Sequence, residues 1–194
     1  MSLTRKPDIN KLTLSAVMIS LSAALSMVKV LEMPLGGSVT LLSMLPVCML
    51  SIMYGCKHGL FCAFLFALSQ LAVNIGQLAG WGLTPAALAG CIVFDYLAAF
   101  TVLGFSGLFR KKGTPGCISG IALAASMRLA SHVISGSIFF AVFVPEGWNA
   151  LGYSLCYNLA YMLPEFIFTA AGAVLLLRNK HTSKLFRIIS TTQE

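Results

Sequence analysis

The stretch MRLASHVISGSIFFAVFVPEGWNALGYSLCYNLAYMLPE, at residues 127–165, decides the fold class. It predicts two apolar helices joined by a short turn that contains Pro145 and Gly147. Five polar side chains stand inside these helices, at Arg128, His132, Tyr153, Asn158 and Glu165. A charged or strongly polar group at membrane depth is costly unless it pairs or lines a cavity. We therefore expect this pair of helices to carry half of a buried polar site.

The composition predicts an integral membrane protein. Of the 194 residues, 58% are hydrophobic and 10% are charged, whereas a soluble domain carries about 25% charged residues. The apolar runs are long enough for helices, and we expect one membrane domain over residues 1–194 with no room for a soluble domain. The six cysteines form no CxxC pair and stand mostly in apolar runs, which favours small packing residues.

Six apolar runs predict an all-α, polytopic protein with six transmembrane helices, at 12–31, 39–54, 59–78, 85–109, 116–144 and 149–177. Eleven of the 13 basic residues fall on the side of the two termini, and Lys29 falls on the other side. The positive-inside rule then places both termini in the cytoplasm. The net charge of +7 follows this topology pattern, so we do not expect a nucleic-acid partner.

Depth along the predicted helices separates the polar side chains into two layers. Counting about 1.5 Å per residue from the outer helix ends puts Asp95, His132 and Asn158 at similar depth in the outer half of the membrane. Arg128 and Glu165 lie deeper, also at matching depth, and are predicted to form a structural ion pair.

The outer layer has the residue types of a binding cavity. A carboxylate suits a cation, amide and imidazole groups give directional hydrogen bonds, and aromatic faces allow stacking, so a flat, positively charged heteroaromatic ligand would fit. The predicted ligand residues are Asp95, Tyr96, His132, Gly136, Tyr153, Tyr157, Asn158 and Trp148. Two alternatives stay open: His132 and Asp95 could be a satisfied core pair, and Trp148, like Trp81, could be an interfacial anchor.

Two further features have a structural and a functional interpretation. The outer loop KVLEMPLGGSVT, at 29–40, could be a lid hinged at Gly36 and Gly37, or a simple re-entrant turn. In the first helix, Ala16, Ser20 and Ala24 recur every four residues. Such a stripe of small residues allows close approach of another helix, either within this protein or from a separate membrane protein.

Catalytic motifs are absent from the sequence. It contains no HExxH, GxSxG or Walker motif and no metal-ligand spacing, so we predict neither an enzyme nor a metal site. The chain would not hydrolyse ATP by itself, and active transport would need a partner or an ion gradient.

Four segments together resemble the S components of energy-coupling factor (ECF) vitamin transporters, of the thiamine-specific ThiT type. They are MPLGGSVTLLSMLP at 33–46, FDYLAAFTVLGFSGLFR at 94–110, RLASHVISGSIFF at 128–140 and YSLCYNLAYMLPE at 153–165. The resemblance implies a multi-pass protein of a prokaryotic plasma membrane that binds thiamine from outside. It also implies docking, through the small residues of the first helix, onto an ECF transmembrane coupling protein that carries two ATPases. No cofactor is implied, because ATP is used only by the ATPase subunits.

The resemblance assigns the thiamine site to Asp95, Tyr96, His132, Gly136, Tyr153 and Asn158, and the docking position to Ala16, Ser20 and Ala24. The chain departs from the family pattern in two places. The outer loop has no aromatic residue, and Phe140 stands where a tryptophan is expected. These departures leave room for a related ligand, such as a thiamine precursor. The alternative function is a stand-alone, proton-coupled secondary transporter in which Asp95 and His132 relay the proton.

Overall fold

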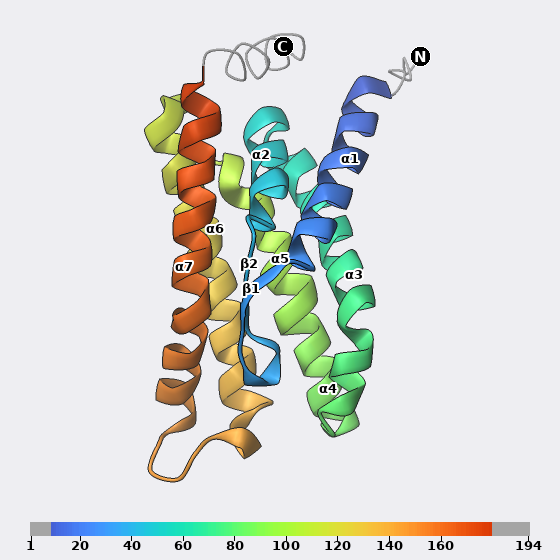
Figure 1. Ribbon diagram of the computed structural model, residues 1–194, viewed down its shortest axis with the longest axis vertical. Coiled ribbons are helices and arrows are strands. Elements are labelled where there is room, and N and C mark those ends of the chain that lie inside the picture. Colours follow the sequence, from blue (N-terminus) through green and yellow to red (C-terminus); the bar gives the residue numbers. More distant parts are fainter. Residues whose placement is uncertain (1–8, 180–194) are drawn as a thin grey trace, which may run out of the picture.

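The computed structural model describes residues 9–179, which form a helical bundle with one short hairpin of strands (Figure 1). Within these residues, five helical segments are long and apolar enough to cross a membrane, and one further apolar helix is shorter. The five are α1 (Ile9–Ser26), α3 (Cys56–Gly80), a composite helix (Pro85–Gly107), Arg110–Ile138, which contains α6, and α7 (Ala150–Arg178). The prediction of a largely helical membrane protein is therefore confirmed.

The first predicted helix, 12–31, is wrong at its C-terminal end. α1 ends at Ser26, and β1 (Lys29–Glu32) pairs antiparallel with β2 (Ser38–Thr40), so the described chain is not all-α. The intervening turn, η1 (Pro34–Gly36), has Gly36 at φ 90° and folds the chain back on itself. A short apolar run does not by itself distinguish a helix from a strand, which explains the error.

The second predicted helix, 39–54, begins later than expected. α2 (Met44–Tyr54) has 11 residues and is about 17 Å long, short of the roughly 30 Å hydrocarbon core. The β-hairpin precedes it and extends the path of the chain (Figure 1). The crossing predicted as one helix is thus divided between a hairpin and a short helix.

α2 lies in the centre of the bundle. All ten residues from Met44 to Met53 are buried, which fits a helix that is apolar on every side. Ser51 is the point of closest contact with its neighbours: a Cβ on Gly59 of α3 would lie 2.4 Å from the Ser51 Cβ. On η3 (Val102–Gly107), a Cβ on Gly107 would lie 2.2 Å from the Ser51 carbonyl oxygen. Glycine is required at these crossings because the backbones nearly touch.

The fourth predicted helix, 85–109, is a composite. α4 (Pro85–Cys91) begins with Pro85 after the capping side chain of Thr84, which accepts from the Ala87 N–H at 3.3 Å. The chain then continues as a π-helical stretch, η2 (Ile92–Ala98), followed by α5 (Ala99–Thr101) and η3. π-Helical turns are rare and often lie at functional sites.

The last two predicted helices are close to those observed. η4 (Arg110–Lys112) leads into α6 (Gly113–Ile138), which ends before Val144, because residues 141–143 form the short turn η5 (Ala141–Phe143). α7 is capped by the Asn149 side chain, which accepts from the Gly152 N–H at 2.6 Å.

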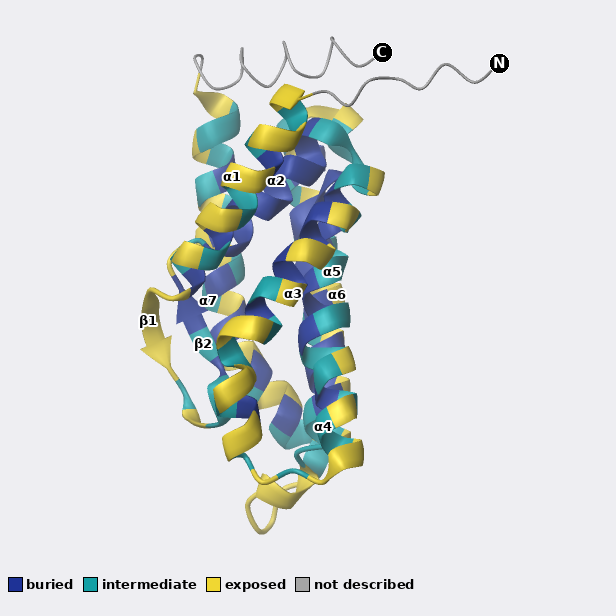
Figure 2. Cartoon of the chain, turned by 90° about the vertical axis from the view of Figure 1, so that its right-hand side faces the viewer, coloured by how far each residue is buried: buried dark blue, intermediate teal, exposed yellow. Residues whose placement is uncertain are grey.

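Figure 2 shows exposed positions along the outside of the bundle. Many of the exposed side chains are large and apolar, including Val17, Phe61 and Leu163. These side chains suit contact with lipid. The start of α1 and the end of α7 lie at the same end of the bundle (Figure 1). The terminal segments 1–8 and 180–194, which hold five of the basic residues used to predict orientation, lie outside the described residues.

Candidate functional site

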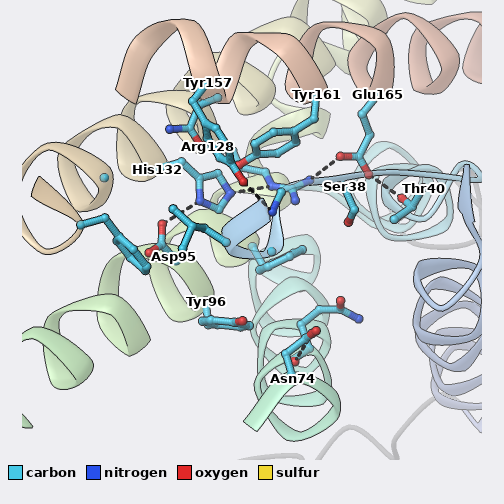
Figure 3. Close-up of a pocket in the computed structure, with 18 of the residues that line it drawn as sticks. Ser38, Thr40, Asn74, Asp95, Tyr96, Arg128, His132, Tyr157, Tyr161 and Glu165 are labelled. Atoms are coloured by element: carbon cyan, nitrogen blue, oxygen red, sulfur yellow. Dashed lines mark hydrogen bonds and ion pairs between the residues drawn. The ribbon is translucent and has the colours of Figure 1, made fainter. Parts of the chain in front are cut away.

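A cavity lies between the β-hairpin, α3, η2, α6 and α7 (Figure 3). Its empty volume is about 1030 Å³, part of which is open to solvent. Seven of the eight predicted ligand residues line it, namely Asp95, Tyr96, His132, Gly136, Tyr153, Tyr157 and Asn158. Trp148 is not among the lining residues; it is 55% exposed, and its ring meets the edge of Tyr153 with centroids 6.0 Å apart.

Asp95 projects from the π-helical stretch toward α6. Its Oδ1 accepts from His132 Nδ1 at 2.8 Å, and its Oδ2 accepts from the Ser135 hydroxyl. The Cys91 thiol, one turn earlier, also donates to Oδ2 at 3.2 Å. The Ser131 hydroxyl bonds the Phe94 carbonyl at 2.6 Å, which fixes this turn of backbone against α6. Asp95 is therefore a firmly oriented carboxylate on the cavity wall.

His132 connects Asp95 to Arg128. The Arg128 Nε lies 3.3 Å from His132 Nε2, and arginine can only donate, so Nε2 is the accepting nitrogen. Nδ1 then carries the proton and donates a hydrogen bond to Asp95, which sets the tautomer of the ring. Both ring nitrogens are engaged, and the ring meets the edge of Tyr161 at 6.1 Å between centroids.

Arg128 and Glu165 lie together as expected for an ion pair, with Nη1 3.6 Å from Oε2. They are 5% and 1% exposed, and both line the cavity. Glu165 Oε1 also accepts from Thr40 at 2.6 Å and from Ser43 at 3.2 Å, which ties α7 to the end of the hairpin (Figure 3). Because Arg128 also bonds His132, the two predicted layers form one continuous network from Asp95 to Thr40, in which hydrogen bonds are joined by the Arg128–Glu165 ion pair.

Asn158 is held by its own helix. Its Nδ2 donates to the Ser154 carbonyl at 2.8 Å, and its Oδ1 accepts from the Tyr161 hydroxyl at 2.7 Å. Tyr153 stacks on Tyr157 with centroids 6.3 Å apart and planes at 29°, so α7 supplies an aromatic wall beside this amide.

Gly136 was predicted as a ligand residue, and the structure gives a packing reason for glycine at this position. A Cβ at this position would lie 2.2 Å from the Ser154 Oγ. The Ser154 hydroxyl donates to the Val133 carbonyl at 3.1 Å. Gly136 therefore lets α6 and α7 approach closely beside the cavity, which it also lines.

Comparison with known proteins agrees with this geometry. Residues 12–186 match the family described as "Thiamine transporter protein (Thia_YuaJ)". The chain belongs to this family.

Two relatives within the thiamine transporter family are named "Thiamine transporter ThiT". The protein of Bacillus subtilis (strain 168) is 35% identical over 186 residues, which cover 90% of each chain. The protein of Lacticaseibacillus paracasei is 26% identical over 146 residues, covering 69% of this chain and 70% of the relative. A solved structure of ThiT from Listeria monocytogenes has the same fold, with a TM-score of 0.74, 21% identity and coverage of 92% of this chain and 97% of that one. This chain is thus a multi-pass membrane protein of a transporter family.

Several lining residues of this thiamine transporter family member were not predicted as ligand residues. Trp81 was interpreted only as an interfacial anchor, yet it lines the cavity and meets the edge of Phe140 at 5.3 Å between centroids. It also packs against Gly36, so the residue that follows α3 brings an aromatic ring to a loop that has none. Gln70 and Asn74 of α3 line the cavity as well. α3 is apolar around most of its surface, and the helical spacing of Gln70, Asn74 and Gln77 is the sequence signal that could have indicated which side faces the site.

The small-residue stripe of α1 faces outward. Ala16, Ser20 and Ala24 are exposed, whereas Ser15 and Ser22 are buried against the bundle. The Ser15 hydroxyl bonds the Lys11 carbonyl and lies 2.8 Å from His58 Nε2 on α3. Packing of the stripe within this chain is therefore not its role in the described structure.

Proposed function

We propose that this chain is the high-affinity substrate-binding subunit of an ATP-driven ECF importer, and that its substrate is thiamine. The observation that carries the proposal is an aromatic-lined cavity with a surplus of formal negative charge on its wall. Asp95 and Glu165 supply two negative charges, and Arg128 supplies one positive charge. Lys29 also lines the cavity, but its ammonium is paired with Glu32 at 2.6 Å.

One unbalanced negative charge suits a monovalent cation with a flat ring. The thiazolium of thiamine is such a ring, and aromatic faces stabilise cations further. Two aromatic pairs that line the cavity, Tyr153 with Tyr157 and Trp81 with Phe140, offer those faces. The names of the relatives, both thiamine transporters, support the same substrate.

The importer assembly is also part of the proposal. Six crossings, counting the hairpin and α2 as one, would place both termini in the cytoplasm. The exposed stripe at Ala16, Ser20 and Ala24 would dock onto an ECF transmembrane coupling protein, which carries the two ATPases. The absence of an ATPase motif in the sequence fits this division of labour.

The charge argument is tested by equilibrium binding to the purified protein. We expect tight binding of radiolabelled thiamine, and much weaker binding of an analogue whose thiazolium is replaced by an uncharged ring of the same size. Asp95→Asn should reduce this preference for the cation. Glu146→Gln, a matched change at an exposed position in the α6–α7 loop, should not alter it. Equal binding of both compounds by the unaltered protein would contradict the proposal.

The proton-coupled alternative has its own test. Liposomes that contain this chain alone, with an imposed pH gradient and no ATP, should not accumulate thiamine. Accumulation would favour a proton relay through the Asp95–His132 hydrogen bond of 2.8 Å.

A further inference from the structure

The β-hairpin forms the outer wall of the cavity. All four residues of β1 are exposed, and Figure 2 shows the strand at the edge of the molecule. On the inner side, Lys29, Gly37, Ser38 and Thr40 line the cavity. Among residues 9–179, the hairpin is thus a single layer between the cavity and the outside.

The tip of the hairpin, residues 34–37, bridges two helices. On the α7 side, the Tyr157 hydroxyl accepts from the Gly37 N–H at 3.0 Å and donates to the Pro34 carbonyl oxygen. On the α3 side, a Cβ on Gly36 would lie 2.9 Å from Trp81 Cζ2, so the indole ring packs against the tip. Tyr157 therefore binds the backbone on both sides of the turn and holds it across the gap between α3 and α7.

The tip and the base of the hairpin are attached separately. Leu35 has φ 63°, a left-handed conformation that is strained for leucine, and Gly36 follows at φ 90°. At the base, Val39 is buried with Tyr161 and Met162, and Thr40 donates to Glu165 at 2.6 Å. Loss of the Tyr157 bonds would leave these base contacts in place and would let the strained tip relax.

We infer that the Tyr157 hydroxyl is a latch that holds the hairpin tip over the cavity and sets how long a bound ligand stays. Tyr157 is in this respect a positioning residue, because both capacities of its hydroxyl are used by the tip. The identity of the ligand rests on the proposed function, whereas the latch itself does not.

The first test compares Tyr157→Phe with the unaltered full-length protein. The change removes the hydroxyl and keeps the ring that stacks on Tyr153. Without ligand, amide hydrogen exchange in a peptide covering 33–39 should become faster, and exchange in α6 and α7 should stay unchanged. The dissociation rate of radiolabelled thiamine should rise about tenfold, equivalent to 1.4 kcal/mol, and the association rate should change less. Tyr54→Phe, at the end of α2 away from the hairpin, is the matched control. It should alter neither the exchange at 33–39 nor the dissociation rate.

A second variant approaches the same contact from the hairpin. Gly37 has φ −59°, which alanine adopts readily, but its Cβ would lie 2.6 Å from the Tyr157 hydroxyl oxygen. Gly37→Ala should therefore reproduce the faster exchange at 33–39, even if Tyr157→Phe does not fold. Unchanged exchange at 33–39 in both variants would overturn the latch. Failure of the unaltered protein to bind thiamine would instead overturn the proposed function, and the exchange measurement would still decide the latch.

Discussion

Tyr161 and Asn158 lie one turn apart on α7, and the Tyr161 hydroxyl donates to Asn158 Oδ1 at 2.7 Å. The Ser154 carbonyl accepts from the other side of the same amide. Similar pairs hold Asp95 through Ser135 and His132 through Arg128. Asn158, Asp95 and His132 are thus each oriented by a buried polar group, so substitutions of the supporting residues should also affect binding.

Tyr161→Phe tests this support. The variant keeps the ring but leaves Asn158 Oδ1 without its donor, and the amide can then rotate. A hydrogen bond of this kind contributes about 1 kcal/mol, so thiamine affinity should fall about fivefold in isothermal titration calorimetry. The same change at Tyr54 should have no effect, and an equal loss at both positions would contradict the interpretation.

The Arg128–Glu165 pair should matter for stability. Arg128→Met leaves a carboxylate that is 1% exposed without its counter-charge, which costs roughly 3–5 kcal/mol. The melting temperature in detergent should fall by about 10 °C. In the double variant Arg128→Met with Glu165→Gln, the buried charge is absent, and much of this loss should be recovered. A double variant that melts lower than Arg128→Met would contradict this account.

At the scale of elements, the polar faces of α6 and α7 could be predicted from the sequence because Arg128, His132 and Gly136 recur at helical spacing in an otherwise apolar run. The hairpin could not be predicted in the same way. Its strands are four and three residues long, and they pair only because residues 34–36 turn the chain back. The contribution of α3 could have been predicted in the same way as that of α6, because Gln70, Asn74 and Gln77 recur at helical spacing in an apolar run and Trp81 continues the same face.

Glycine at the crossing of α2 and η3 gives a prediction for packing. Gly107→Ala would place a Cβ 2.2 Å from the Ser51 carbonyl oxygen, in backbone that is buried on all sides. We expect a loss of about 1–3 kcal/mol, measured as a lower melting temperature. Gly76→Ala is the matched control, because nothing lies within 4 Å of its added Cβ, and the greater helix propensity of alanine should slightly stabilise α3. Equal effects of the two changes would show that the crossing is not closely packed.

At the scale of the whole molecule, the cavity and the stripe on α1 lie on different surfaces. The cavity is bounded by the hairpin, α3, η2, α6 and α7, whereas Ala16 and Ser20 face outward from α1. Binding of substrate and docking of a partner should therefore be separable by mutation.

Ala16→Leu tests this separation. The bulkier side chain should leave thiamine binding by the isolated protein unchanged and should reduce co-purification with the coupling protein and its ATPases at least several-fold. Ala171→Leu, at an exposed position of α7, makes the same change on another surface and should leave co-purification intact. Loss of binding in Ala16→Leu would show instead that the stripe supports the fold of this chain.

The π-helical stretch Ile92–Ala98 also affects which single-residue deletions related chains can tolerate. A π-turn holds one residue more than an α-turn, so deletion of a single residue here would let the segment rewind as a regular helix. Because the deleted residue would be the extra one of the π-turn, the residues beyond it would keep nearly the same phase about the helix axis, and Gly104 and Gly107 would still face Ser51. Homologous chains that share this fold should therefore tolerate loss of one residue across 92–98 more readily than loss of one inside α6 or α7, where the same deletion would rotate the rest of the helix by about 100°.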